Sequence, residues 1–259
     1  MSFFCDKINE DGTTKHIELD ITLHWRKEEC EMKKDWSIAD LRETFDVLAS
    51  FYQIELGSKK YLCRNHAVIF RKGFANQTSP DAVIVMANPG SCSPISQTYQ
   101  PATIDGIPIN LPYVAVKLDP TQRQLMKLMN KMNWNVLSVI NLSDLCGGNM
   151  GDFSEKLRQV ELHSFKNHTV FSEARKEERE TILPSTDSKI ILAWGKDNSI
   201  KTLAYESLKI LSKELQKDKQ IFGLPYLETN WGYRHPNPMI KDRCEEWLEK
   251  MYKQLTKMQ

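Results

Sequence analysis

The chain has 259 residues, of which 41% are hydrophobic and 27% are charged, and its formal net charge is +1. This composition excludes a largely disordered chain, and the length predicts one large domain or one domain with an addition. A net charge near zero lowers the expectation of a nucleic-acid partner. It does not exclude one, because binding requires a positively charged face rather than a positive net charge.

Targeting and cysteine signals are weak. No apolar stretch approaches the ~18 residues of a membrane span, and the N-terminus lacks the apolar region of a signal peptide. We therefore expect a cytoplasmic protein without membrane association. The six cysteines include no Cys-x-x-Cys pair, which favours buried free thiols over disulfides or a metal site.

Residues 1–57 are predicted to be an N-terminal extension, and residues 58–259 an α/β domain. The alternation of residues 16–25 predicts a strand, and the charged residues 27–34 predict a turn. Ser37 can cap a helix that runs roughly to Tyr52.

The remaining elements alternate between strands and helices. Strands are predicted at 60–71, 83–87, 134–141 and 189–194, and one or two short strands within 220–230; the runs that begin at Val83, Val136 and Ile190 are short and rich in Val and Ile. Helices are predicted from Pro120, with Asp119 as the N-cap, over 200–217, and near the end of the chain. The proline-containing segment 91–117 predicts a lid or binding loop, and the charged residues 152–180 predict a surface helix with a loop.

This alternation predicts a three-layer α/β fold with a central, mostly parallel sheet. In such sheets, ligands bind beyond the carboxyl ends of the strands. Asn88, Asn141 and His235 follow or close predicted elements, so we expect them around one crevice. Two amides and an imidazole can read and polarise a heterocycle or a carbonyl group.

Four motifs occur in order: Asn88-Pro89-Gly90, Ile140-Asn141, Ala193-Trp194-Gly195 and His235-Pro236-Asn237-Pro238. Taken together, they resemble the motifs of the uracil-DNA glycosylase superfamily. The chain resembles more closely a family of uncharacterised bacterial proteins, which also carries the Asp-Pro-Thr seen at 119–121. That likeness covers roughly residues 60–255 and names no activity.

The glycosylase resemblance implies a role for each matching residue. Asn88 would position the attacking water, Asn141 would read the edge of an extruded base, and His235 would stabilise charge on the leaving base. Asp119 could supply a base, and Tyr99 or Tyr113 could stack on the nucleobase. The expected catalytic residues are Asn88, Asp119 and His235; the base contacts are Pro89, Gly90, Tyr99, Tyr113, Asn141 and Trp194; and the phosphate contacts are Arg123, Lys127, Arg234, Pro236 and Asn237.

The chain also departs from the superfamily. The Asp and Tyr of its most active branch are absent from the first motif, and Met239-Ile240 replaces the usual Leu-Ser wedge. Structural readings therefore stay open: Asn88 as a turn former, Asn141 as a local backbone partner, and Asp119 as a cap alone. His163 and His168 lie in the charged segment and are expected to be solvated.

The function expected from the resemblance is an N-glycosylase that excises a damaged or modified, pyrimidine-type base from an extruded nucleotide. It would need no cofactor, and its partner would be nucleic acid, DNA before RNA. Two alternatives are a hydrolase or transferase acting on free nucleotides or nucleosides, and a non-catalytic nucleic-acid-binding module.

Overall fold

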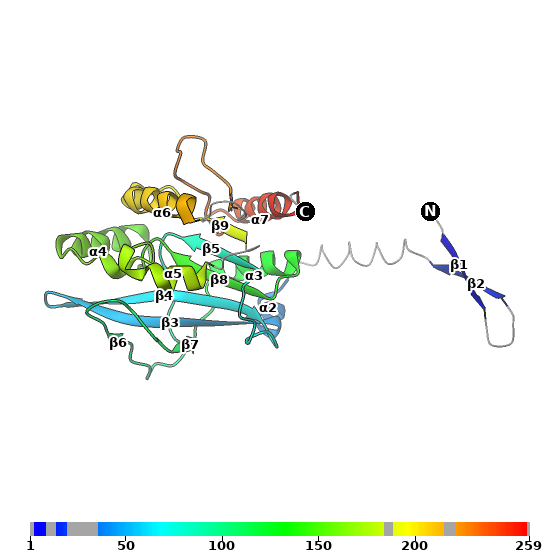
Figure 1. Ribbon diagram of the computed structural model, residues 1–259, viewed down its shortest axis with the longest axis horizontal. Coiled ribbons are helices and arrows are strands. Elements are labelled where there is room, and N and C mark those ends of the chain that lie inside the picture. Colours follow the sequence, from blue (N-terminus) through cyan, green and yellow to red (C-terminus); the bar gives the residue numbers. More distant parts are fainter. Residues whose placement is uncertain (1–2, 9–13, 20–35, 184–188, 215–220, 258–259) are drawn as a thin grey trace. The chain divides into compact units, whose positions relative to one another are not determined.

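The computed structural model describes residues 3–8, 14–19, 36–183, 189–214 and 221–257 (Figure 1). The chain divides into two compact units, Met1–Ser37 and Ile38–Gln259. In the first unit, β1 (Phe3–Ile8) and β2 (Thr14–Leu19) form an antiparallel pair. The predicted turn at 27–34 and residues 20–25 of the predicted strand 16–25 lie outside the described residues.

The second unit is built on one mixed sheet of mostly parallel strands. Its strand order is β10-β9-β5-β8-β4-β3-β6, and β7 also pairs with β3. Strands β10, β9, β5 and β8 are parallel to one another, whereas β4 runs antiparallel to both β8 and β3. The strands are β3 (Phe45–Leu56), β4 (Lys59–Arg71), β5 (Ala82–Met86), β6 (Ala102–Thr103), β7 (Tyr113–Ala115), β8 (Val136–Asn141), β9 (Lys189–Leu192) and β10 (Ile221–Gly223).

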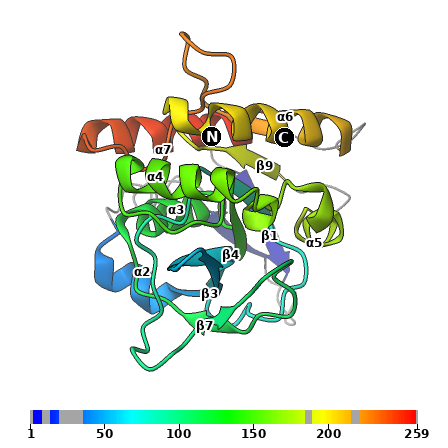
Figure 2. The same cartoon turned by 90° about the vertical axis from the view of Figure 1, so that its left-hand side faces the viewer.

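Helices cover both faces of this sheet, which confirms the α/β class and the layered arrangement. Figure 2 shows α2, α3 and α7 on one side of the sheet and α5 and α6 on the other. The core includes Val83 and Val85 of β5, Phe153 of α4 and Leu211 of α6. The helices are α2 (Ile38–Thr44), α3 (Pro120–Met132), α4 (Met150–Leu162), α5 (Lys176–Ile182), α6 (Lys201–Glu214) and α7 (Lys241–Thr256), with short 3₁₀ turns η1 (Lys166–His168), η2 (Glu173–Arg175) and η3 (Asn198–Ile200).

The predicted helix from Ser37 to Tyr52 is wrong beyond its first turns. Helix α2 ends at Thr44, and the chain continues directly as β3, which pairs with β4 along its whole length. Burial in β3 alternates on either side of an irregularity at Ser50/Phe51, where the register with β4 shifts, so the alternation changes phase and the apolar residues imitate a helical pattern. Residues 38–57 thus belong to the main unit, and the expected boundary at residue 57 moves to residue 37.

The proline-containing segment 91–117 lies along the edge of the sheet. Its two short strands, β6 and β7, both pair with β3. The backbone amides of Ile104 and Val116 also donate to the carbonyl oxygens of Gln53 (2.7 Å) and Val47 (3.4 Å). Much of this segment is therefore fixed to a strand by backbone hydrogen bonds.

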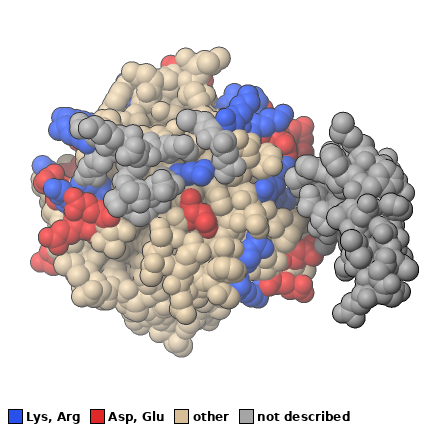
Figure 3. All heavy atoms as spheres, turned by 45° about the vertical axis from the view of Figure 1, so that its right-hand side comes forward, with Lys and Arg blue, Asp and Glu red and all other residues tan. Residues whose placement is uncertain are grey.

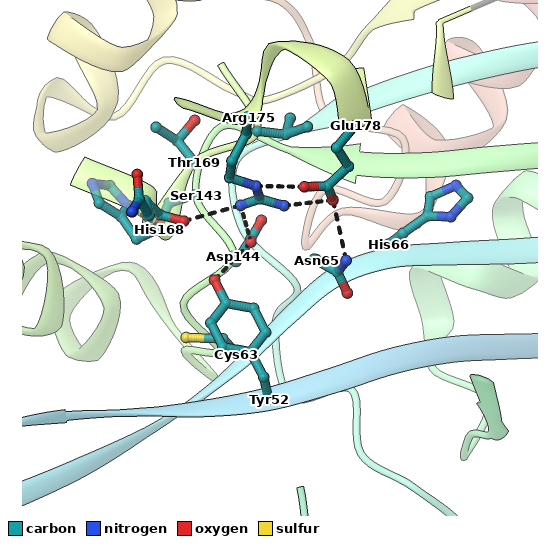
Figure 4. Close-up of polar contacts among 12 residues, drawn as sticks. Tyr52, Cys63, Asn65, His66, Ser143, Asp144, His168, Thr169, Arg175 and Glu178 are labelled. Atoms are coloured by element: carbon teal, nitrogen blue, oxygen red, sulfur yellow. Dashed lines mark hydrogen bonds and ion pairs between the residues drawn. The ribbon is translucent and has the colours of Figure 1, made fainter. Parts of the chain in front are cut away.

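The charged segment 152–180 is not wholly a surface element, contrary to expectation. Arg175 and Arg179 are each 1% exposed, and His168 is buried with Nδ1 2.9 Å from Ser143 Oγ. Arg175 pairs with Asp144 through Nη1 and with Glu178 through Nε (2.7 Å), as Figure 4 shows. This ion-pair network fastens η2 and α5 to the loop that follows β8.

The network extends into the antiparallel part of the sheet. Tyr52 donates its hydroxyl to Asp144 Oδ2 at 2.8 Å, and Asn65 Nδ2 donates to Glu178 Oε1 at 3.1 Å (Figure 4). Burial raises the pKa of Asp144 to about 6, although the Arg175 guanidinium beside it acts in the opposite direction. Removing a partner from this network is therefore expected to leave a charge without solvent or counter-ion.

Lowering the pH is expected to destabilise the fold by a few kcal/mol. Burial lowers the pKa of both His66 and His168 to about 4, against ~6.5 in an unfolded chain. Above about pH 6.5 both histidines are neutral in the folded and the unfolded chain, and the fold has its full stability. As the pH falls towards 4, the unfolded chain takes up the two protons first, and the free energy of unfolding drops by ~3 kcal/mol for each histidine. Asp144 has the opposite effect on stability, because its pKa is raised in the folded state and its protonation at low pH favours folding. This gain from one carboxyl group is smaller than the loss from the two histidines.

Urea unfolding at about pH 7.5 and about pH 4.5 measures this difference in the free energy of unfolding. His168→Gln cannot take up the proton, so this variant should lose less stability between the two pH values. Equal stability of the wild-type protein at both values would contradict the expectation.

Candidate functional site

A cavity of about 480 Å³ lies at the carboxyl ends of the parallel strands. Strand β5 lies between β8 and β9. The chain leaves β5 towards β8 on one side and later returns to β9 on the other, so the order of the strands reverses at β5. Such a reversal leaves a crevice between the loops that follow the strands. The loops after β5, β8 and β9 line the cavity, as expected, together with the start of α3 and the turn that contains His235.

Asn88, two residues beyond β5, is held in one orientation. Its Nδ2 donates to the carbonyl oxygen of Gly147 at 2.9 Å, and among the described residues no group donates to its Oδ1. Gly147 has room for no side chain, because a Cβ there would lie 2.8 Å from Phe153 Cβ. An aspartate in place of Asn88 would set two oxygens against each other, which explains why an amide suits this position.

Pro89 and Gly90 complete the same turn and also line the cavity. Gly90 has a φ of 65°, in the left-handed region, which favours glycine. A Cβ built on it would meet nothing within 4 Å, so this part of the wall borders open space. The backbone can therefore be approached closely here by a ligand.

Asp119 combines the predicted cap with a position on the cavity wall. Its Oδ1 accepts from the Gln122 amide (2.8 Å), and Gln122 Oε1 accepts from the Asp119 amide (3.0 Å). This reciprocal pair is a capping box at the start of α3. The cap uses one carboxylate oxygen and leaves the other available.

His235 is half-buried, and its tautomer follows from its hydrogen bond. The backbone amide of Asn237 donates to His235 Nδ1 at 3.2 Å, so the neutral ring carries its proton on Nε2. Burial lowers the pKa of His235, and the nearby Asp119 carboxylate offsets this only in part. At neutral pH the ring is therefore an uncharged donor through Nε2.

The turn that contains His235 is held from two sides. Gly195 and Tyr233 exchange two backbone hydrogen bonds (2.7 and 3.1 Å), which join this turn to the end of β9. Trp247 of α7 donates its Nε1 to the Arg234 carbonyl oxygen at 3.0 Å. Trp194 is 2% exposed and donates to Trp231 O at 2.7 Å, so it is mainly a core residue that also contributes to the cavity wall.

Three of the expected base contacts do not line this cavity. Asn141 is completely buried; in the amide orientation that satisfies both neighbours, it donates to Asn88 O and accepts from Arg64 Nη2, each at 3.1 Å. Tyr99 lies outside the cavity wall. Tyr113 bonds to His66 Nδ1 and lines a second cavity of about 540 Å³. Asn141 is the last residue of β8, and its side chain is directed to the backbone of Asn88 rather than to the cavity, so it is a structural partner of Asn88.

The expected phosphate contacts are only partly available. Asn237 lines the cavity, but Pro236 is buried outside its wall, and Arg234 pairs with Glu246 of α7 at 3.2 Å. Arg123 and Lys127 are half-buried on α3 and do not reach the wall. Further along that helix, Lys131 pairs with Glu249. On the face drawn in Figure 3, Lys and Arg side chains lie among Asp and Glu side chains.

Sequence reasoning missed Arg64. This residue lies in β4, is 3% exposed, and lines the cavity beside Met86 and Val139. Its signal in the sequence is a charged residue inside a predicted strand, where burial normally requires a partner. The strand containing it was predicted correctly, but its contribution to the site depends on β8, which lies far along the chain.

The described residues hold no candidate metal site and no candidate membrane span. No group of three His, Cys, Asp or Glu side chains there is arranged to hold a metal ion. None of the helices in that part of the chain is both long and apolar enough to cross a membrane.

Comparison with known proteins gives one match. A family model described as "Protein of unknown function (DUF1643)" matches residues 113–254, which is more than half of the chain. No curated protein and no solved structure is detectably similar. The matched region holds β7 to β10 and most of α7, including Asp119, Trp194 and His235. The expectation of an uncharacterised domain family is confirmed, and the chain belongs to the DUF1643 family of proteins of unknown function.

Proposed function

We propose that the protein is an N-glycosylase that excises a damaged or modified pyrimidine base from a nucleotide extruded from nucleic acid, DNA rather than RNA. The observation that carries the proposal is that Asn88 and His235, from motifs far apart in the sequence, line one cavity with Asp119. A cavity of about 480 Å³ falls within the range of small-ligand sites, ~300–1,000 Å³, and suits one flipped nucleotide.

The chemistry follows from the groups that face this cavity. Asn88 Oδ1 accepts from a water and directs it at C1′ of the sugar, but an amide takes no proton. The Asp119 carboxylate takes that proton as the water oxygen bonds to C1′. The C1′–N bond breaks, and its electron pair stays on the base. His235 donates from Nε2 to the oxygen on which negative charge grows.

A second candidate is an enzyme that acts on free nucleotides or nucleosides in the same cavity. It is favoured by the ion pairs Arg234–Glu246 and Lys131–Glu249, which occupy two of the cations that a nucleic-acid backbone would need. Salt separates the two candidates. Binding to an oligonucleotide weakens steeply with salt and depends on its length, whereas a single nucleotide shows little of either effect.

The test is the release of free base from a panel of oligonucleotides and genomic DNAs with normal, deaminated and modified bases, read by mass spectrometry. We expect release by the wild-type protein, and a loss of at least ~100-fold in Asn88→Ala, since Asn88 positions the attacking water. The matched control is Asn130→Ala, which lies on α3 outside the cavity and should retain the activity. Absence of release across the panel, or equal release by both variants, would refute this mechanism.

A further inference from the structure

Arg64 is a buried cation on the wall of the cavity. It is 3% exposed, and it lies on β4, next to the buried end of β8. Its guanidinium makes one side-chain hydrogen bond within the described residues, from Nη2 to the Asn141 oxygen at 3.1 Å. Its Nε is buried and has no partner there.

No carboxylate among the described residues lies within ion-pair distance of Arg64. The two carboxylates that line the cavity serve other groups: Asp119 caps α3, and Asp197 Oδ1 accepts from the amide and hydroxyl of Ser199. A charge removed from water is costly unless a partner of opposite charge accompanies it. Arg64 therefore lacks the counter-charge that a buried guanidinium normally has.

Arg175 shows what this protein provides for a buried guanidinium elsewhere. That side chain pairs with the carboxylates of Asp144 and Glu178 and also donates to the Asn167 carbonyl oxygen at 3.1 Å. Arg64 has the same burial but one neutral acceptor. The difference between the two sites is that Arg64 borders a cavity open to a ligand, so the ligand can supply the missing acceptors.

We propose that Arg64 is the anion receptor of this cavity, and that the ligand presents an anionic group with adjacent acceptor atoms to its guanidinium. Arginine carries donors only, so an amino group at that end would place N–H against N–H. The planar fork matches two acceptors side by side, as in a carboxylate, a phosphate or a deprotonated heterocycle.

This identification rests on the proposed function: the anion is the departing base. When the C1′–N bond breaks and its electron pair stays on the base, the negative charge spreads over the ring nitrogens and oxygens. His235 stabilises this charge with one neutral donor, and Arg64 adds a positive charge. The favoured substrates are then bases with acidic ring N–H groups, whose anions are the better leaving groups.

Calorimetric titration of the free product bases tests this inference without turnover. The probes are uracil and 5-nitrouracil, because the nitro group acidifies the ring and makes the anion abundant at neutral pH. We expect the wild-type protein to bind 5-nitrouracil at least ~10-fold more tightly, and Arg64→Gln to lose this preference. The matched control is Arg71→Gln, on the same strand but outside the cavity, which should keep it.

A second measurement needs no variant and so does not depend on the folding of one. The affinity of the wild-type protein for 5-nitrouracil is followed from below to above the pKa of the ligand. Tighter binding of the anion supports the inference, and equal binding of both forms overturns it. In the first measurement, a preference for 5-nitrouracil that is retained in Arg64→Gln also overturns it.

Inorganic phosphate is the third probe, and it separates the possible sources of the anion. Binding of phosphate that requires Arg64, without binding of either pyrimidine, keeps the anion receptor and rejects a base as its ligand. An anion preference that requires Arg64, with no base released from the oligonucleotide panel, keeps the receptor and rejects excision. Released base with no effect of Arg64→Gln on either assay keeps excision and rejects the receptor.

Discussion

Replacing Arg175 with methionine is expected to lower the free energy of unfolding by about 3–5 kcal/mol, because it leaves the buried Asp144 carboxylate without its counter-ion. Methionine fills much of the volume but provides no hydrogen bond. Glu178 keeps only its hydrogen bond from Asn65, and Tyr52 keeps its bond to an uncompensated charge. Urea unfolding at constant pH measures the loss.

Arg158→Met is the matched control for this prediction. Arg158 also pairs with a glutamate three residues away, Glu155, but both side chains are more than half exposed. The same substitution there should change stability by no more than ~0.5 kcal/mol. Adding Asp144→Asn to Arg175→Met removes the orphan charge and should recover part of the loss. An effect of Arg175→Met as small as that of Arg158→Met would mean that the network contributes little.

His235→Ala is expected to slow base release by about 10²–10³-fold, the range found when one donor to a developing negative charge is removed. The reason is the donor on Nε2, where the neutral ring carries its proton because the Asn237 amide donates to Nδ1. Burial lowers the pKa of His235 below the ordinary value of an imidazole, so the ring is neutral at any pH above that value. Titration of His235 should therefore give the rate of base release no pH dependence between about pH 7 and 8.

The rate of base release under single-turnover conditions measures the chemical step, and binding of the same oligonucleotide measures affinity, so the two together separate the effects. The control is His163→Ala, an exposed histidine that directly follows α4 and bonds to Gln159 O. We expect that variant to keep the wild-type rate. A His235→Ala rate close to that of His163→Ala would remove the imidazole from the mechanism.

The parallel part of the sheet could be predicted from the sequence, because each strand there is short, apolar and bounded by turn residues. The place of Asn88 and His235 followed from the rule on carboxyl ends. β3 could not be predicted in this way, since the irregularity at Ser50/Phe51 shifts the phase of the alternation that identifies a strand.

The buried charges show a different limit. The composition of residues 152–180 indicated a solvated surface, yet Arg175 is enclosed because its partner Asp144 comes from the loop after β8. Arg64 and Asn141 also meet only through the pairing of β4 with β8. Such contacts join distant segments, so a single sequence holds no local signal for them.

The pairing of β6 and β7 with β3 has a consequence for solubility. β3 is twelve residues long and borders the sheet, and a bare strand of that length presents a row of free amides and carbonyl groups to any other chain. The short strands occupy Leu48–Ser50 and Tyr52–Gln53, and Val116 bonds at Val47, so most of this row is already engaged. The segment 91–117 thus protects the molecule against edge-to-edge aggregation and the first steps of fibril growth.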